Sequence, residues 1–344
     1  MPTMRRFPPI LLALSMVMSA LYSLAVLQGP PGIRTLCRVQ SARRALGEEM
    51  ARRGVPFDEH LPFLGVEWSE ITTTQGDLES KTLSARSVWA LRALRWFERA
   101  GLHPGDRVLV FSSSSFPALL VSVLLAAQEA GLDVTCVVSL GASSYGANRP
   151  EAPWPVMEGC LLRSRVLQRP ALAYTLGGEG ETGGGIPPKG LETLIRSARS
   201  AGVPIWRDRI LERKLQLVRS AGPKLVVSIG GSAANLGDDP AVLEVPSGLV
   251  MPRPDAGNGL VGEVLRMGTP VLYLIDLKGL HRREGLGAGR SWVPALGLAL
   301  FLAVLGVNRR FVLLEGHEGG QAMAGSAPPP GGDGAEVRIE ARAR

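Results

Sequence analysis

Three short loops rich in serine and glycine hold the side chains best suited to chemistry. Each follows a predicted strand, and they span residues 112–115, 141–148 and 230–232. In an open parallel sheet, ligands gather beyond the carboxyl ends of the strands, where the first N–H groups of helices are unsatisfied. Hydroxyls and bare amides there suit a carboxylate or a phosphate, whereas helix capping and tight packing are the alternative. The expected ligand-binding residues are Ser112, Ser114, Ser115, Gly141, Ser143, Ser144, Asn148, Gly230, Gly231 and Ser232.

A serine nucleophile is the enzymatic alternative. Ser114 stands between a predicted strand and a predicted helix, as the nucleophile of an α/β-hydrolase does. The glycine elbow is incomplete, because Ser112 occupies the position of its first glycine. Among the four histidines, only His281 follows a late strand, where it could act as a base. The candidate catalytic residues are therefore Ser114, Ser144 and His281. These residues do not make up a complete catalytic motif.

The sequence contains no motif for a metal, and none that firmly indicates a cofactor. Cys37, Cys136 and Cys160 are scattered, and the four histidines show no metal-ligand spacing. The segment 101–140 is similar to the opening of adenylate-forming enzymes and 182–190 to their phosphate loop, but that loop has few hydroxyls. Nucleotide binding is therefore a minor alternative. The net charge of +7 is dispersed, which argues against nucleic acid as a partner.

The elements that position these loops follow a repeated βαβ pattern. An amphipathic helix is predicted over 36–53, before the first repeat. Further helices are predicted over 87–100, 117–130, 190–201, 206–221 and 259–267. Strands are predicted over 107–111, 134–140, 173–176, 224–229 and 270–276. Residues 33–286 are therefore expected to form an α/β domain, layered and Rossmann-like, around a parallel sheet.

Two hydrophobic segments flank the predicted domain. Residues 10–27 are uncharged, follow a short basic tail at 1–9, and approach the length that crosses a bilayer. A cleaved signal peptide is the alternative reading of this segment. Residues 291–307 form a second predicted span, for which a buried core helix is the alternative. Residues 316–344 are rich in Gly, Pro and Ala and are predicted to be a disordered tail.

Two spans would place both termini on one side of the membrane and the α/β domain on the other. Arg5 and Arg6 lie in the short amino-terminal tail, and basic tails favour the cytoplasm. The expected location is therefore the cell membrane, with cytoplasmic termini and an extracytoplasmic domain.

Five motifs occur in an order that resembles one bacterial family. They read GVEWSEITTTQGDLESK at 65–81, SSFPALL at 114–120, SLGASSYGANRP at 139–150, VVSIGGSAANLG at 226–237 and GLVGEVLRMGTPVLYLIDLKGL at 259–280. This set resembles the poly-γ-glutamate system protein family, over most of 36–286. The family tends to have Gly before Ser114, where this chain has Ser113.

The resemblance implies a role beside the machinery that makes poly-γ-glutamate. The expectation is a membrane-anchored accessory protein of synthesis, export or anchoring of the polymer. Its α/β domain would bind an anionic glutamyl chain or a partner subunit of the synthase or exporter. The alternatives are a serine-dependent hydrolase or transferase acting on the polymer or a precursor, and a purely structural subunit.

Overall fold

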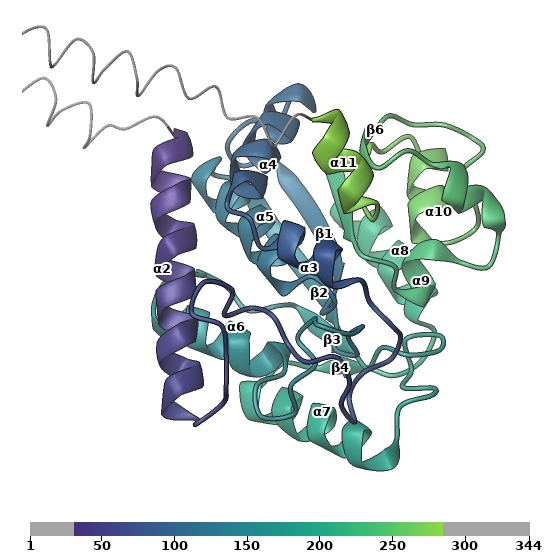
Figure 1. Ribbon diagram of the computed structural model, residues 1–344. Helices are drawn as coiled ribbons and strands as arrows, with labels where there is room; N and C mark the ends of the chain where they lie inside the picture. Colours follow the sequence, from purple (N-terminus) through teal and green to yellow (C-terminus); the bar gives the residue numbers. More distant parts are fainter. Residues whose placement is uncertain (1–30, 285–344) are drawn as a thin grey trace, which may run out of the picture. The chain divides into compact units, whose positions relative to one another are not determined.

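A seven-stranded, mostly parallel sheet forms the centre of the computed structural model, which describes residues 31–284 (Figure 1). The strand order is β4-β3-β2-β1-β5-β7-β6, and only β6 runs antiparallel to its neighbour. The strands are β1 (Arg107–Ser113), β2 (Asp133–Ser139), β3 (Ala173–Thr175), β4 (Ile205–Trp206), β5 (Leu225–Ile229), β6 (Gly248–Val250) and β7 (Val271–Leu274). The predicted α/β class and parallel sheet are confirmed.

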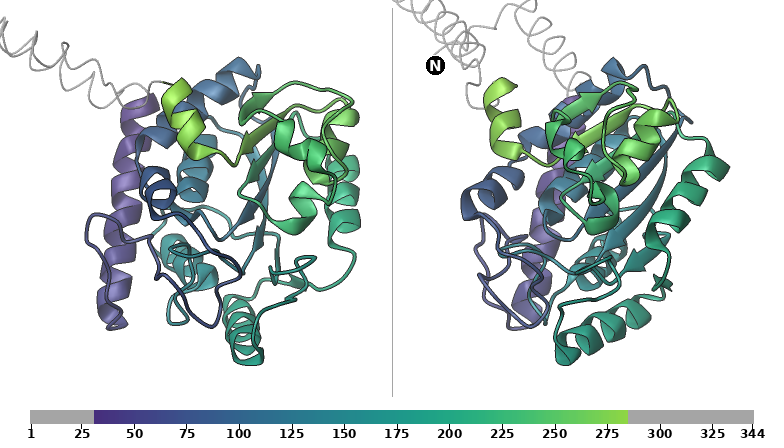
Figure 2. Two further views of the ribbon diagram at one scale, coloured as in Figure 1. Left: turned by 45° about the vertical axis from the view of Figure 1, so that its right-hand side comes forward. Right: turned by 90° about the vertical axis from the view of Figure 1, so that its right-hand side faces the viewer.

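Helices cover both faces of the sheet (Figure 2). The first face carries α2 (Pro31–Arg52), α4 (Val88–Arg99), α5 (Pro117–Glu129), α6 (Trp154–Arg163) and α7 (Pro188–Ala201). The second face carries α8 (Ile210–Ala221) and α10 (Leu260–Arg266). The remaining elements are short: α3 (Leu78–Ser84), α9 (Ala233–Leu236), η1 (Pro240–Glu244) and α11 (Leu277–Arg283).

The strands are apolar because both of their faces are buried. Along β1, Val108 and Val110 join the core under α5, whereas Leu109 and Phe111 join the core under α10. A parallel sheet covered on both faces has this continuous apolar pattern. Helix α5 is apolar all round for the same reason, since α2 and α4 pack on the side of α5 that faces away from the sheet.

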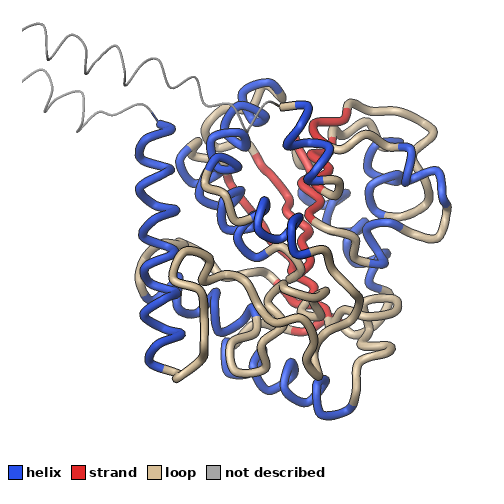
Figure 3. The backbone as a smooth tube through the Cα atoms, in the orientation of Figure 1, coloured by secondary structure: helices blue, strands red, loops and turns tan. Residues whose placement is uncertain are grey.

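The order in which the chain adds strands to the sheet reverses between β1 and β5, although the two strands are parallel. From β1 the chain moves outward through β2 and β3 to β4, and it then returns to β5 on the other side of β1. Ligands of open α/β sheets bind outside the carboxyl ends of the strands at such a reversal. Long loops gather at that end of the sheet (Figure 3).

Two predicted boundaries were wrong at functionally relevant places. Strand β1 continues through Ser112 and Ser113, which pair with Val138 and Ser139, so these serines lie in the strand and not in a turn. The helix predicted from Trp206 begins at Ile210 instead, because Trp206 belongs to strand β4, where it pairs with Thr175 of β3. Pairing with a neighbouring strand explains both differences, because local periodicity does not reveal which residues find a partner across the sheet.

Within residues 31–284, no helix combines the length and the apolar character needed to cross a bilayer. The predicted spans at 10–27 and 291–307 lie outside the described residues, as do the tails at 1–9 and 316–344.

Candidate functional site

A segment from Gly65 to Gly76, here called the cover segment, lies along the loop 141–148 at the carboxyl end of the sheet. Tyr145 N donates to the Val66 carbonyl at 2.8 Å, and Thr73 N donates to the Ala142 carbonyl at 2.9 Å. A Cβ on Gly65 would lie 1.9 Å from Asn148 Oδ1, so only glycine allows this approach. The cover segment therefore fills much of the edge that the sequence predicts to be open to ligand.

Asn148, a predicted ligand-binding residue, clamps the cover segment. Its Oδ1 accepts from Val66 N at 2.9 Å, and its Nδ2 donates to the Val66 carbonyl at 2.7 Å and to Thr72 Oγ1 at 2.9 Å. The side chain is completely buried. These three bonds use both polar groups of the amide, so the structure gives Asn148 a positioning role.

Ser112 and Ser114, at the end of β1, also form hydrogen bonds within the protein. The hydroxyl of Ser114, which is completely buried, donates to the Ser139 carbonyl at 2.7 Å, and Ser112 Oγ donates to the Ser113 carbonyl at 3.0 Å. His281 lies instead against Arg86, with 3.3 Å between its Nε2 and Arg86 Nη1. The structure therefore does not join Ser114 and His281 into a nucleophile and base.

Ser143 is brought against a lysine that the sequence analysis did not single out. Lys81 Nζ lies 2.7 Å from Ser143 Oγ, and it also donates to the Ser115 carbonyl. It stands 3.8 Å above the centroid of the Phe116 ring. Ser115 Oγ accepts from Ser143 N at 3.0 Å, so the two predicted serines hold each other.

The Lys81 ammonium is buried without a carboxylate to pair with it. Burial lowers the pKa of Lys81 to about 7, and the charge of Asp77 only partly opposes this shift. Asp77 is itself bound by Lys278 at 2.7 Å, and Lys278 also binds Glu79 at 2.6 Å. Near neutral pH, a large fraction of Lys81 is therefore an uncharged amine beside the Ser143 hydroxyl.

A second buried lysine, Lys214 of α8, has the opposite environment. Its Nζ lies 2.6 Å and 2.9 Å from the two carboxylate oxygens of Glu181 and 2.8 Å from Asn235 Oδ1. Burial alone would raise the pKa of Glu181, but the charge and hydrogen bonds of Lys214 hold that pKa below its ordinary value. This paired lysine stabilises the structure and leaves no free charge for a ligand.

The other predicted glycines pack closely against the site. Gly230 has a φ of +76°, and a Cβ there would lie 2.3 Å from Ser113 Oγ. A Cβ on Gly141 would lie 2.6 Å from Thr73 Cγ2. In the third loop, the Ser232 hydroxyl is one of the groups that lower the pKa of Glu181. Gly231 completes that loop between Gly230 and Ser232.

A groove of about 570 Å³ opens beside the cover segment, between the carboxyl end of α2 and helices α6 and α7. Four cations line it against two carboxylates: Arg53, Arg163, Lys189 and Arg196 against Glu70 and Glu151. The cations come from three distant parts of the sequence, which is why the sequence shows only dispersed charge.

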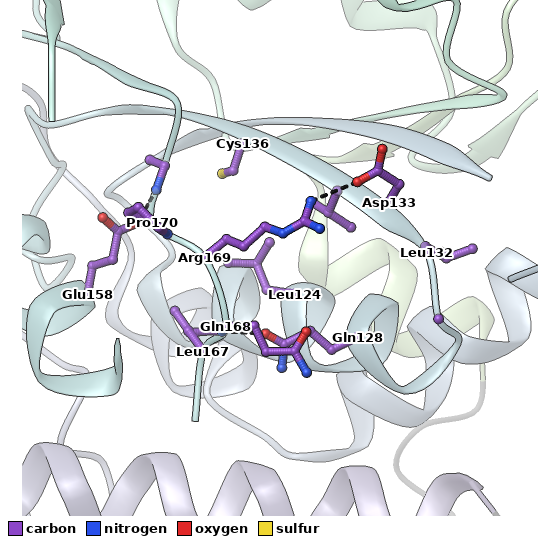
Figure 4. A pocket seen from close by; sticks show the side chains of 13 residues that line it. Leu124, Gln128, Leu132, Asp133, Cys136, Glu158, Leu167, Gln168, Arg169 and Pro170 are labelled. Carbon is purple, nitrogen blue, oxygen red and sulfur yellow. Dashed lines mark hydrogen bonds and ion pairs between the residues drawn. The ribbon is translucent and has the colours of Figure 1, made fainter. Parts of the chain in front are cut away.

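A cavity of about 300 Å³ lies along the first half of β2 (Figure 4). Its charges already have partners, since Arg169 Nη1 lies 2.8 Å from Asp133 Oδ1. Glu158 accepts from Tyr174 Oη and from Ala171 N. Burial raises the pKa of Glu158, although these hydrogen bonds oppose the shift. The lining of this cavity holds two carboxylates and one guanidinium group, whereas cations outnumber carboxylates in the groove.

Within residues 31–284, no group of three His, Cys, Asp or Glu side chains is arranged to hold a metal ion. No protein-family model matches the chain, and no curated protein matches it.

Proposed function

We propose that this chain is a membrane-anchored accessory protein of poly-γ-glutamate synthesis, export or anchoring, whose α/β domain binds the glutamyl chain in the cationic groove. The observation that carries this proposal is the excess of cations in the groove. A γ-linked glutamyl chain has one free carboxylate on each residue. Regularly spaced carboxylates suit arginine, whose guanidinium binds them through two parallel hydrogen bonds.

The groove retains positive charge after its internal ion pairs are taken into account. Glu49 at the end of α2 is shared by Arg52, Arg53 and Arg163, so three guanidinium groups face one carboxylate. Arg196 lies 3.9 Å from the exposed Glu192, and the side chains of Arg163 and Arg196 are 61% and 67% exposed, so both can reach a ligand. Lys189 pairs with Glu70 at 2.8 Å but is 81% exposed.

The positions of the two ends of the described chain support the anchored arrangement. A Cβ on Gly32 would lie 3.0 Å from Leu91 Cδ2, and the next residue of α4, Arg92, donates to the Glu284 carbonyl at 2.8 Å. The two ends of the described chain therefore lie beside the same turn of α4 (Figure 1). Two predicted spans leaving one end of a domain fit a membrane hairpin with both termini on one side.

Helix α2 then separates the groove from the membrane. Its 22 residues correspond to a length of roughly 33 Å, with Gly32 at one end and Arg53 just beyond the other. The groove would stand at the far end of the domain, where it could meet a polymer or a partner subunit of the synthase. The domain is proposed to be extracytoplasmic and the termini cytoplasmic.

Binding of an end-labelled γ-glutamyl oligomer to the full chain in detergent tests the proposed function. The double variant Arg163→Glu/Arg196→Glu should bind about tenfold or more weakly, because it reverses two charges in the groove. Arg207→Glu/Arg219→Glu is the matched control, since it makes the same change in net charge at two exposed positions, one just before α8 and one within it. Equal losses in both variants would refute the groove as the binding site.

A serine-dependent hydrolase or transferase acting on the polymer or a precursor is the second candidate. It is favoured by one observation, the contact between the Lys81 amine and the Ser143 hydroxyl.

A further inference from the structure

The two buried lysines at the carboxyl end of the sheet differ in one respect. Lys214 binds the carboxylate of Glu181, whereas Lys81 binds a hydroxyl, a carbonyl and an aromatic ring. Among the described residues, Lys81 forms no ion pair. A buried lysine costs stability unless it is paired, so an unpaired one beside a hydroxyl needs an explanation.

We propose that Ser143 is a nucleophile and Lys81 its general base, in hydrolysis or transfer at an amide carbonyl of an acidic chain. The geometry carries this assignment, because the amine and the hydroxyl are already within hydrogen-bond distance at 2.7 Å. The choice of an acidic chain as substrate rests on the proposed function. The assignment of Ser143 as the nucleophile does not rest on the proposed function.

The backbone around Ser143 is held on both sides. Ser143 N donates to Ser115 Oγ, Ser144 N donates to the Thr74 carbonyl at 3.0 Å, and Gly146 N donates to the Ser143 carbonyl at 3.0 Å. Tyr145 adopts a φ of +60°, which is rare for a residue with a side chain. Strained turns of this kind concentrate at sites where a side chain must be presented in one direction.

Exposure distinguishes Ser143 from the serine that the sequence favours. Ser143 retains 9% of its surface, whereas Ser114 retains none. Gly76 of the cover segment approaches the pair from above, and a Cβ there would lie 3.2 Å from both Ser143 Oγ and Lys81 Cε. That Cβ would also lie 2.6 Å from the Ser144 carbonyl, so only glycine lets the cover segment pack this closely against the pair.

The proposed reaction balances with water or an acceptor amine as co-reactant. The neutral Lys81 amine takes the proton of the Ser143 hydroxyl as Oγ bonds to the amide carbonyl carbon. The C–N bond then breaks, the departing nitrogen takes that proton from Lys81, and the acyl group is left on Ser143 as an ester. Water or an amine attacks the ester, and its proton returns through Lys81 to Ser143 Oγ.

The protonation state of Lys81 should set the pH dependence of this reaction. Its pKa of about 7 results from burial, with Asp77 opposing the shift. The charged groups around it are Asp77 and Glu79 of the α3 region and Lys278 of α11, which binds both of these acids. The reaction rate should therefore rise as the pH increases through about 7 and then level off.

Two measurements on the full chain in detergent test the proposal: labelling by a biotinylated fluorophosphonate, and shortening of γ-glutamyl oligomers. Wild type is expected to be labelled on Ser143 and to shorten the oligomer. Ser143→Ala should abolish both, and Ser144→Ala, its neighbour, should retain both. Lys81→Met should slow both by on the order of 100-fold or more, with its fold checked by thermal melting.

Failure of this proposal can be told apart from failure of the proposed function. Ser143→Ala should bind the oligomer as wild type does, and Arg163→Glu/Arg196→Glu should keep its labelling. A wild-type chain that shows neither labelling nor shortening would overturn the nucleophile, even if it binds the oligomer. Labelling that persists in Ser143→Ala would overturn it as well.

Discussion

Lys214 of α8 and Glu181 of the loop between β3 and α7 form an ion pair of 2.6 Å, although they are 33 positions apart, and both side chains are almost completely buried. Glu181 also accepts from Thr175 Oγ1 at 2.7 Å and from Ala234 N at 3.1 Å. One carboxylate therefore joins the end of β3, the start of α9 and helix α8. The pair connects the two halves of the sheet across the reversal between β1 and β5.

Removing one partner of this pair should destabilise the protein strongly. Lys214→Met leaves the Glu181 carboxylate buried without its cation, which should cost roughly 3–5 kcal/mol of unfolding free energy. The double variant Lys214→Met/Glu181→Gln should recover a large part of that loss, because no charge is then buried. Urea unfolding followed by circular dichroism would measure both. Equal stability of the single variant and wild type would contradict the structural role of the pair.

Lys81 should make the stability depend on pH in the alkaline range. Its pKa is about 7 in the folded chain and near 10.5 when unfolded. Between these values the unfolded state binds more protons, so stability should rise with pH, by up to about 1.4 kcal/mol per pH unit. Lys81→Met should lack this rise. Urea midpoints of both proteins at pH 7 and pH 9 test the prediction, and parallel changes in the two would contradict it.

The sheet could be predicted because its strands are covered on both faces. The segments around Val108–Phe111 and Leu225–Ile229 are mostly apolar runs flanked by glycine or serine residues, and such runs indicate buried parallel strands. The edge strand β6 has only three residues, and β4 only two. Elements this short carry no periodicity of their own, so they were not predicted.

The candidate site could be predicted only in part, because long-range contacts determine its chemistry. The serines and glycines are recognisable as loops at strand ends, but Lys81 lies outside every predicted helix and strand. Its contact with Ser143 joins residues 62 positions apart. The sequence could not predict that these cations line one groove for the same reason, because α2, α6 and α7 come together only in the folded chain.

Asn148 should control the position of the cover segment. Asn148→Ala removes three hydrogen bonds, to Val66 N, the Val66 carbonyl and Thr72 Oγ1. Their loss leaves the part-buried Val66 N–H without a partner, whereas the Val66 carbonyl keeps the Tyr145 N–H, and it should cost about 1–3 kcal/mol. Limited proteolysis should then cut within residues 65–76 faster than in wild type. Ser220→Ala, an exposed substitution on α8, is the control, and equal rates of cutting would contradict the clamp.

Native cysteines allow the proposed sidedness of the domain to be measured with a single reagent. Cys37 on α2 is exposed, whereas Cys136 and Cys160 are buried. A membrane-impermeant maleimide should therefore label Cys37 in intact cells if the domain is extracytoplasmic, and Cys37→Ser should lose that label. Adding Ser220→Cys to Cys37→Ser places an exposed thiol on α8, on the second face of the sheet, and should restore the label. Protection of both thiols until the cells are lysed would place the domain in the cytoplasm and contradict the proposed orientation.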